Sequence, residues 1–250
     1  MKIISPIIDN NKFNRMSFKK NDNGDTVVKK SNKNEDTKKI AITSSAFSIG
    51  AILLSLYALS KAKTKKTGKA VKMFSMHLHE GDIFALGAST VIGATAGGII
   101  VDDNKYKKAK IREASHQIIG NIAAPLAFIW GFNKGVEKLN IKLPKIKGTS
   151  KQAKAANFAL EILPNLITTC AGLYAGINVG NVISNKINDN IFGKKDKKRE
   201  VKIADYCIHI DDPITVLTLA DKSGKIKAFT GKVMPFVFIL SGYQSGMARE

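Results

Sequence analysis

The sequence has few cysteines and none of the short motifs that mark common catalytic folds. Its 250 residues include only Cys170 and Cys207, which lie in different contexts without metal-ligand spacing. Two cysteines so placed give no basis for a disulfide scaffold. The chain also has no phosphate-binding loop, no serine nucleophile elbow and no His-Glu-x-x-His zinc helix. Enzyme classes that depend on those motifs have no support, and the balance favours a protein that is not an enzyme.

Arginine is scarce although the chain is strongly basic. Only four of the 40 basic residues are arginine, and the formal net charge is +20. Aromatic residues make up 7% of the chain and rarely accompany the lysines. Because nucleic-acid binding favours arginine and stacked aromatics, we expect no specific nucleic-acid partner. Lysines beside apolar helices instead fit the headgroups of anionic lipids.

Charges are absent from five long stretches of the chain. Residues 40–60 form an uninterrupted run of 21 uncharged positions flanked by lysines, and four shorter or similar runs follow at 83–101, 114–133, 162–183 and 233–248. A helix of about 20 apolar residues crosses a bilayer, whereas a soluble helix needs a polar face. The sequence therefore predicts an all-α, polytopic protein of the cell membrane. A soluble helical domain is the alternative, because the mean hydropathy of −0.06 is only average.

The first 39 residues are mostly polar and contain ten basic side chains. Their composition predicts a disordered basic tail, and their length before the first apolar run argues against a cleavable signal peptide. The excess of lysine and arginine on the side of the tail places this tail in the cytoplasm.

Two pairs of segments resemble each other and occur in the same order. GATAGGIIVDD (93–103) resembles GINVGNVISNK (176–186), and PLAFIWGFNKG (125–135) resembles PFVFILSGYQSG (235–246). Collinear similarity of this kind predicts an internal duplication.

The duplication predicts one leader helix followed by two parallel-repeat helical hairpins. The leader is 40–60, the first hairpin is 83–132, and the second is 162–248 with an inserted segment at about 203–230. If each hairpin returns to its starting side, the C-terminus lies on the membrane face opposite the N-terminal tail.

Small residues recur at helical spacing in these segments. Glycines four residues apart share one helix face, where another backbone can approach closely, and prolines kink a helix. Such residues either pack helices or line a narrow polar path. The candidates are Gly93, Gly97, Gly98, Gly176, Gly180, Pro125 and Pro235.

Two acid–histidine pairs offer a different kind of site. Glu113 precedes His116 by three residues, and Asp205 precedes His209 by four. A carboxylate and an imidazole at these spacings share a helix face, as a divalent metal site requires. Both pairs fall in links between apolar runs on the same predicted side of the membrane. The sequence therefore leaves open a divalent metal or proton-handling site at these four residues.

Three functions remain open at this point. The first is a small permease, pore component or membrane-assembly subunit of unknown substrate. The second is a membrane-bound metal-dependent enzyme that uses the acid–histidine pairs. The third is a membrane scaffold with a basic recruiting tail. The expected partners are the lipid bilayer and its anionic lipids, and a homo-oligomer is left open.

Overall fold

The computed structural model describes most of the chain. The described residues are 16–20, 26–30, 33–74, 76, 78–139, 144–193, 198–207, 209 and 225–249. By internal contacts the chain divides into two units, Met1–Lys39 and Ile40–Glu250. The middle of the predicted insertion, residues 210–224, lies outside the described residues.

The N-terminal unit contains a small antiparallel hairpin. Strand β1 (Met16–Lys20) pairs with β2 (Thr26–Lys30), and Phe18 lies opposite Val28. The strands carry Phe and Val, which favour β-structure, and the sequence Asn-Asp-Asn-Gly-Asp between them is rich in turn residues. This part of the tail differs from the predicted disorder, and helix α1 begins at Lys33, before the tail was expected to end.

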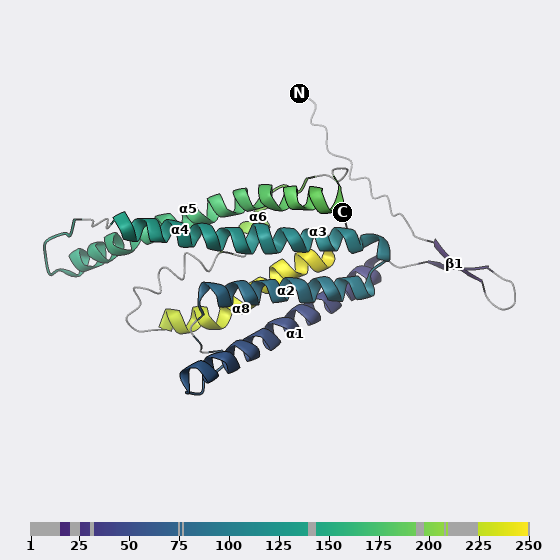
Figure 1. The fold of residues 1–250 in the computed structure, drawn as a ribbon, viewed down its shortest axis with the longest axis horizontal. Helices are drawn as coiled ribbons and strands as arrows, with labels where there is room; N and C mark the ends of the chain where they lie inside the picture. Colours follow the sequence, from purple (N-terminus) through teal and green to yellow (C-terminus); the bar gives the residue numbers. More distant parts are fainter. Residues whose placement is uncertain are drawn as a thin grey trace, which may run out of the picture. The chain divides into compact units, whose positions relative to one another are not determined.

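The second unit is helical (Figure 1). Its elements are α1 (Lys33–Thr67), α2 (Glu80–Val101), η1 (Asn104–Tyr106), α3 (Lys107–Ile118), η2 (Ile119–Ala123), α4 (Ala124–Leu139), α5 (Lys151–Phe192), α6 (Ile203–Cys207) and α8 (Lys225–Met247). Helices α1, α2 and α5 are long and apolar enough to cross a membrane. The predicted helical class is confirmed, and these three helices indicate a membrane-associated protein.

Helices α3 and α4 form one long rod with a π-helical turn, η2, in its middle. In an α-helix the carbonyl of Asn121 would accept from the amide of residue 125. Pro125 has no amide hydrogen, so this bond is lost and the helix widens just before the proline. The predicted effect of Pro125 on helix geometry therefore takes the form of a π-turn.

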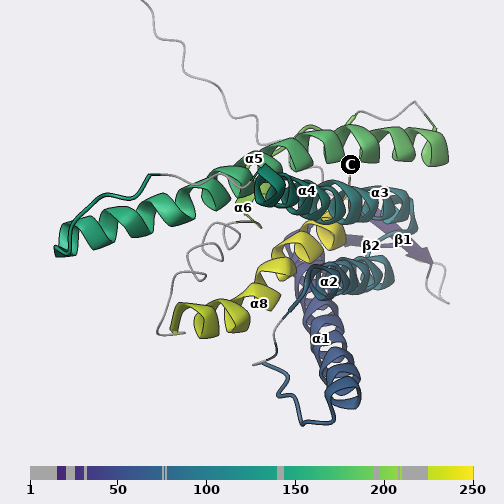
Figure 2. The same ribbon diagram turned by 60° about the vertical axis from the view of Figure 1, so that its left-hand side comes forward.

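Helix α5 runs antiparallel to this rod, and Figure 2 shows it lying along α3 and α4. A Cβ atom added at Gly172 would lie 2.8 Å from the Cα of Ile129, and one added at Gly176 would lie 2.5 Å from the Cα of Pro125. One added at Gly180 would lie 2.6 Å from the carbonyl oxygen of Gly120. The glycine ridge of α5 therefore rests directly on the backbone of η2 and α4.

Helix α2 packs in the same manner against α1. Positions Gly93 and Gly97 have no room for a side chain, since added Cβ atoms would lie 2.7 Å and 2.9 Å from the carbonyl oxygens of Phe47 and Thr43. The residue numbers rise along one helix as they fall along the other. Helices α1 and α2 are therefore antiparallel.

Helix α8 runs in the same direction as α2. A Cβ atom at Gly87 would lie 3.2 Å from Phe238, and one at Gly98 would collide with the carbonyl oxygen of Gly246. Thr95 Oγ1 also donates to Ser245 Oγ at 3.0 Å. The sequence colours of α2, α5 and α8 in Figure 1 progress in the same direction.

This direction contradicts the predicted second hairpin, 162–183 with 233–248, because α5 and α8 are parallel. It also corrects the predicted position of the C-terminus, which lies at the same end of the bundle as residues 102–113. The matched glycines differ in surroundings too, since a Cβ added at Gly131 or Gly135 meets no atom of the described residues within 4 Å, whereas Gly242 and Gly246 are tightly packed. The similarity of apolar helices carries no information on their direction.

An apolar core forms where α1, α2, η2 and α8 meet. Its members include Ile52, Leu56, Leu86, Val91, Ile122 and Phe238. These side chains are all nearly or fully buried, so their close packing holds α1, α2, η2 and α8 together.

Replacing Gly176 with alanine should lower stability, whereas the same change at Gly131 should not. The new methyl group at 176 meets backbone atoms of Pro125 that cannot move independently, so we expect a loss of about 1–3 kcal/mol. At Gly131 the methyl group enters open space, and the better helix propensity of alanine should add up to about 1 kcal/mol. Thermal unfolding of the purified protein in detergent measures both. Equal effects at the two positions would contradict the contact described for Gly176.

Candidate functional site

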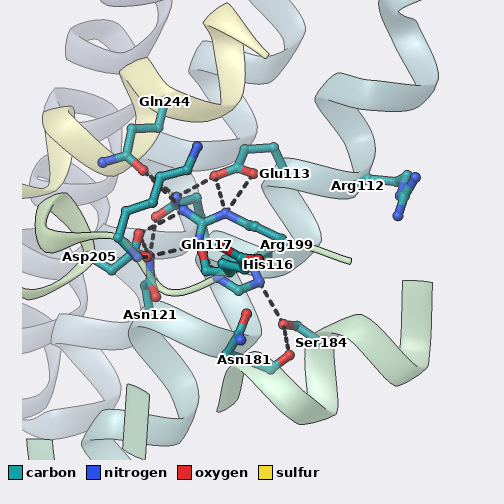
Figure 3. A network of polar contacts seen from close by, with 12 residues as sticks. Arg112, Glu113, His116, Gln117, Asn121, Asn181, Ser184, Arg199, Asp205 and Gln244 are labelled. Atoms are coloured by element: carbon teal, nitrogen blue, oxygen red, sulfur yellow. Dashed lines mark hydrogen bonds and ion pairs between the residues drawn. The ribbon is translucent and has the colours of Figure 1, made fainter. Parts of the chain in front are cut away.

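A cluster of buried polar side chains joins α3, η2, α5, α8 and the segment that follows α5 (Figure 3). Its members are Glu113, His116, Gln117, Asn121, Ser184, Asn185, Arg199, Asp205, His209 and Gln244. We refer to these ten residues as the Arg199 cluster. They come from four separate stretches of the sequence, 113–121, 184–185, 199–209 and 244, which the fold brings together.

The guanidinium of Arg199 lies at the centre of the cluster. Its Nε donates to both carboxylate oxygens of Glu113 at 3.0 and 2.9 Å, and its two terminal nitrogens each donate to one oxygen of Asp205 at 2.7 Å. The remaining N–H groups donate to His116 Nε2 at 2.7 Å and to Gln244 Oε1 at 3.5 Å. The side chain of Arg199 is only 12% exposed and that of Asp205 is fully buried. Every donor of this buried cation therefore has an acceptor, as burial requires.

The backbone of Arg199 is fixed as well. The side-chain amide of Asn185 on α5 donates to the Arg199 carbonyl at 2.8 Å, and its oxygen accepts from the Arg199 amide at 3.1 Å. Asn178 of α5 donates to the hydroxyl of Tyr206 at 3.2 Å. The described part of the segment after α5 is thus pinned to α5 by amide side chains.

The hydrogen bonds of His116 define its tautomer. Because Arg199 donates to Nε2, the ring proton lies on Nδ1, which donates to Ser184 Oγ at 2.7 Å. The hydroxyl of Ser184 in turn donates to the Asn181 carbonyl at 3.1 Å. With its proton facing Ser184, His116 does not act as a base towards that serine.

The π-turn supplies an acceptor to the same cluster. The carbonyl of Asn121, which cannot bond to Pro125, accepts from His209 Nε2 at 2.6 Å. The Asn121 side-chain amide donates to Asp205 Oδ1 at 2.8 Å and to Gln117 Oε1 at 2.9 Å. A backbone carbonyl of the turn that precedes the proline is therefore bonded to a histidine far along the chain.

Asp205 forms a bidentate ion pair with Arg199, because its two carboxylate oxygens each accept from one terminal nitrogen of the guanidinium. Asp205 Oδ2 also accepts from the backbone amide of Lys202 at 2.7 Å. The cluster therefore joins separate helices through ion pairs that are shielded from solvent.

The structure brings the predicted metal-site residues Glu113, His116, Asp205 and His209 into one region but places Arg199 among them. Among the residues described, no group of three or more His, Cys, Asp or Glu side chains is arranged to hold a metal ion. A cation held by the two carboxylates already fills the space that a divalent ion would need. The geometry does not favour the metal interpretation.

A second ion-paired cluster holds the C-terminal end of α8. Lys110 is fully buried, and its ammonium donates to the carbonyls of Gly246 at 2.5 Å and Ala248 at 3.1 Å and pairs with Asp102 at 3.0 Å. Arg249 forms a bidentate pair with Asp102 at 2.9 and 3.0 Å. The last carbonyls of a helix attract cations, so Lys110 caps α8 while Asp102 balances its charge.

The predicted glycines and prolines lie outside the Arg199 cluster. Gly93, Gly97, Gly98, Gly176 and Gly180 occupy close helix contacts, and these contacts favour the packing interpretation over a polar path. The side chain of Pro235 lies outside the described side chains.

Sequence reasoning missed the residues that organise the site. Arg199 and Lys110 each lie in a lysine-rich link, so the sequence alone does not distinguish them from the neighbouring basic residues. One signal was available, since Glu113, Gln117 and Asn121 recur every four residues and so share a helix face. On α5, Asn181, Asn185 and Asn188 are four and three residues apart and so also share a helix face.

Comparison with known proteins identified no relative. No protein-family model matches the chain, and neither the curated proteins nor the solved structures contain a match. The function must therefore be argued from the site and the fold.

Replacing Arg199 with methionine should strongly destabilise the protein, because Glu113 and Asp205 would remain buried without their cation. Loss of one partner of a buried ion pair costs about 3–5 kcal/mol. Adding Glu113→Gln and Asp205→Asn to the Arg199→Met variant should recover part of that loss. Lys134→Gln is a suitable control, since the ion pair of Lys134 with Glu137 is more than half exposed and should be worth less than about 1 kcal/mol. Chemical unfolding in detergent gives the free energy of unfolding of the wild type and of the three variants. Similar losses for Arg199→Met and Lys134→Gln would contradict a stabilising role of the Arg199 ion pairs.

Acid should remove the stabilisation that Asp102 provides. Burial would raise the pKa of Asp102, but hydrogen bonds from Arg249 and Lys110 lower it below the ordinary value of 3.8. A lowered pKa in the folded state stabilises the protein above the unfolded pKa, and the stabilisation disappears as the pH falls through the folded pKa. The melting temperature of Asp102→Asn should therefore lie below that of the wild type at pH 7 and converge with it below about pH 4. A constant difference across this range would contradict the ion pairs.

Proposed function

We propose that this protein is a multi-pass protein of the cell membrane that acts as a structural assembly subunit, with its N-terminal tail in the cytoplasm. The observation that carries the proposal is the closure of the bundle interior. The glycine faces that would line a path rest on neighbouring backbones, and the Arg199 guanidinium uses all its donors within the chain.

The outer surface of the bundle supports a membrane location. Large apolar side chains on α1 and α5 are strongly exposed, including Ile42 at 70%, Leu54 at 71%, Ile167 at 57% and Val182 at 66%. In water such a surface is unfavourable, whereas lipid accepts it. Lysine-rich links at the helix ends fit the headgroup region.

Alkaline carbonate extraction followed by cysteine labelling tests the membrane proposal. In a background with Cys170→Ser and Cys207→Ser, single cysteines are introduced at Lys65, Lys107, Lys147 and Ala248. The protein should remain in the membrane pellet. Positions 107 and 248 should react with an impermeant reagent from one side, and positions 65 and 147 from the other.

Labelling of position 248 together with position 65 would contradict the direction of α8. Complete extraction of the protein by carbonate would overturn the membrane proposal itself. To test the assembly role, the purified protein in liposomes should show no flux of ions, urea or glycerol above that of protein-free liposomes. In native membranes it should migrate in complexes larger than its own 27.1 kDa.

A permease is the second candidate, favoured by the segment between α5 and α8. Because these helices are parallel, the segment between them connects opposite ends of the bundle. Its described part carries Arg199, Asp205 and His209, all inside the protein. Backbone that lies at membrane depth outside a spanning helix is buried in protein or lines a cavity. Solute flux that is lost with Arg199→Gln and retained with Gly131→Ala would favour the permease over the assembly subunit.

A further inference from the structure

We propose that an open groove between α2 and α4 binds an anionic phospholipid. The acyl chain would lie in the groove, and the phosphate would contact Lys134 and Lys138. This inference rests on the membrane location proposed above and adds a specific lipid site to it.

The groove is apolar and open to the surface. It has a volume of about 330 Å³ and is lined by Phe84, Ala123, Leu126, Ala127 and Trp130. Phe84 is 39% exposed and Trp130 is 56% exposed, so two large aromatic side chains form an uncovered wall. The small side chains of Ala123 and Ala127 leave room for the groove between these larger side chains. Tryptophan, with its polar indole N–H, favours the boundary between acyl chains and headgroups.

The end of α4 places two lysines beside the groove. Lys134 and Lys138 follow Trp130 by four and eight residues, so they lie on the same side of the helix, one and two turns closer to its end. Lys134 pairs with Glu137 at 2.9 Å, and both side chains are more than half exposed. An exposed pair of this kind is weak, so it does not prevent the ammonium group from contacting a phosphate.

The surrounding charge favours an anionic lipid over a neutral one. The link from 61 to 72 contains six lysines and no acidic residue, and the stretch from 133 to 157 contains seven lysines and one acidic residue, Glu137. Lys63 pairs with Asp82 at 2.5 Å, which brings the first of these basic links to the start of α2, two residues before Phe84. The groove therefore opens at a strongly basic end of the bundle, where the potential attracts anionic headgroups.

The single tryptophan of the chain makes the site directly measurable. Trp130 is the only tryptophan, so fluorescence quenching by lipids with brominated acyl chains reports occupancy of this groove. The protein is reconstituted in phosphatidylcholine vesicles that contain increasing fractions of brominated phosphatidylglycerol or, in parallel, brominated phosphatidylcholine. We expect phosphatidylglycerol to be preferred by about fivefold for each lysine that contacts its phosphate.

Charge-matched variants separate the groove from general electrostatic attraction. Lys134→Gln with Lys138→Gln should bring the preference close to one. Lys65→Gln with Lys66→Gln removes the same charge at the end of α1 and should leave the preference unchanged. Ala127→Phe fills the groove and should reduce quenching by phosphatidylglycerol.

Other outcomes would overturn the site in distinguishable ways. Equal quenching by both lipids would overturn the anionic lipid site but leave the membrane location intact. Quenching that disappears only at high protein density would assign the groove to a second copy of the chain. Absence of quenching by either lipid, with the protein still resistant to carbonate, would show that the groove is closed to lipid. Absence of quenching together with carbonate extraction would overturn the membrane proposal as well.

Discussion

The burial of the Arg199 guanidinium is the constraint on which the arrangement of the helices depends. Transfer of an ion from water into a protein interior costs several kcal/mol even after relaxation, and only well-placed partners offset that cost. Glu113 on α3 and Asp205 on α6 supply the two carboxylates, while His116 and Gln244 accept the remaining N–H groups. Since these partners belong to separate elements, the cation can be satisfied only when α3, α8 and the segment after α5 are in register. One side chain therefore links three parts of the chain.

Glycine contacts and polar contacts set different properties of the bundle. The ridge of Gly172, Gly176 and Gly180 determines how closely α5 approaches η2 and α4, and in lipid such dispersion contacts replace the hydrophobic effect as the force between helices. Close packing alone tolerates sliding and reversal of a helix. The directional hydrogen bonds of Arg199 and Lys110 do not, and both clusters hold α8 near its C-terminal end. Distance is thus set by the glycines, and register by the buried cations.

The sequence was sufficient to predict the helical class and the presence of apolar helices long enough to cross a membrane. Long runs without charge identify apolar helices because each charged side chain in lipid is costly, and three of those runs fall in helices long and apolar enough to cross a membrane. Glycines four residues apart share a face whatever the tertiary structure, so their use in close contacts could be anticipated. Glu113 and His116, and Asp205 and His209, are paired by local spacing, and all four lie in the Arg199 cluster. In each case a local spacing carried the information.

The organising residues of the site could not be predicted in the same way, since their roles depend on partners far along the chain. Arg199 stands among lysines in the sequence, and nothing local separates it from them. Proline at position 125 predicts a kinked helix, whereas the structure has a π-turn before this proline and a hydrogen bond from His209 to the Asn121 carbonyl within that turn. Such pairings appear only when the three-dimensional fold is known.

The wrong prediction of the second hairpin also arises because the direction of α8 depends on residues far apart in the sequence. Similarity between apolar segments predicts that they run in equivalent directions, but the positions of the polar contacts on each helix decide the direction. Gln244 and the carbonyl of Gly246 lie at the C-terminal end of α8, and their partners Gln117 and Lys110 lie on α3. These bonds require α8 to run parallel to α2, so its glycines meet α1 and α2. At the matching glycines of α4, 131 and 135, an added Cβ meets no atom of the described residues within 4 Å, so this side of α4, bordered by Trp130 and two lysines, is open in the described part of the chain.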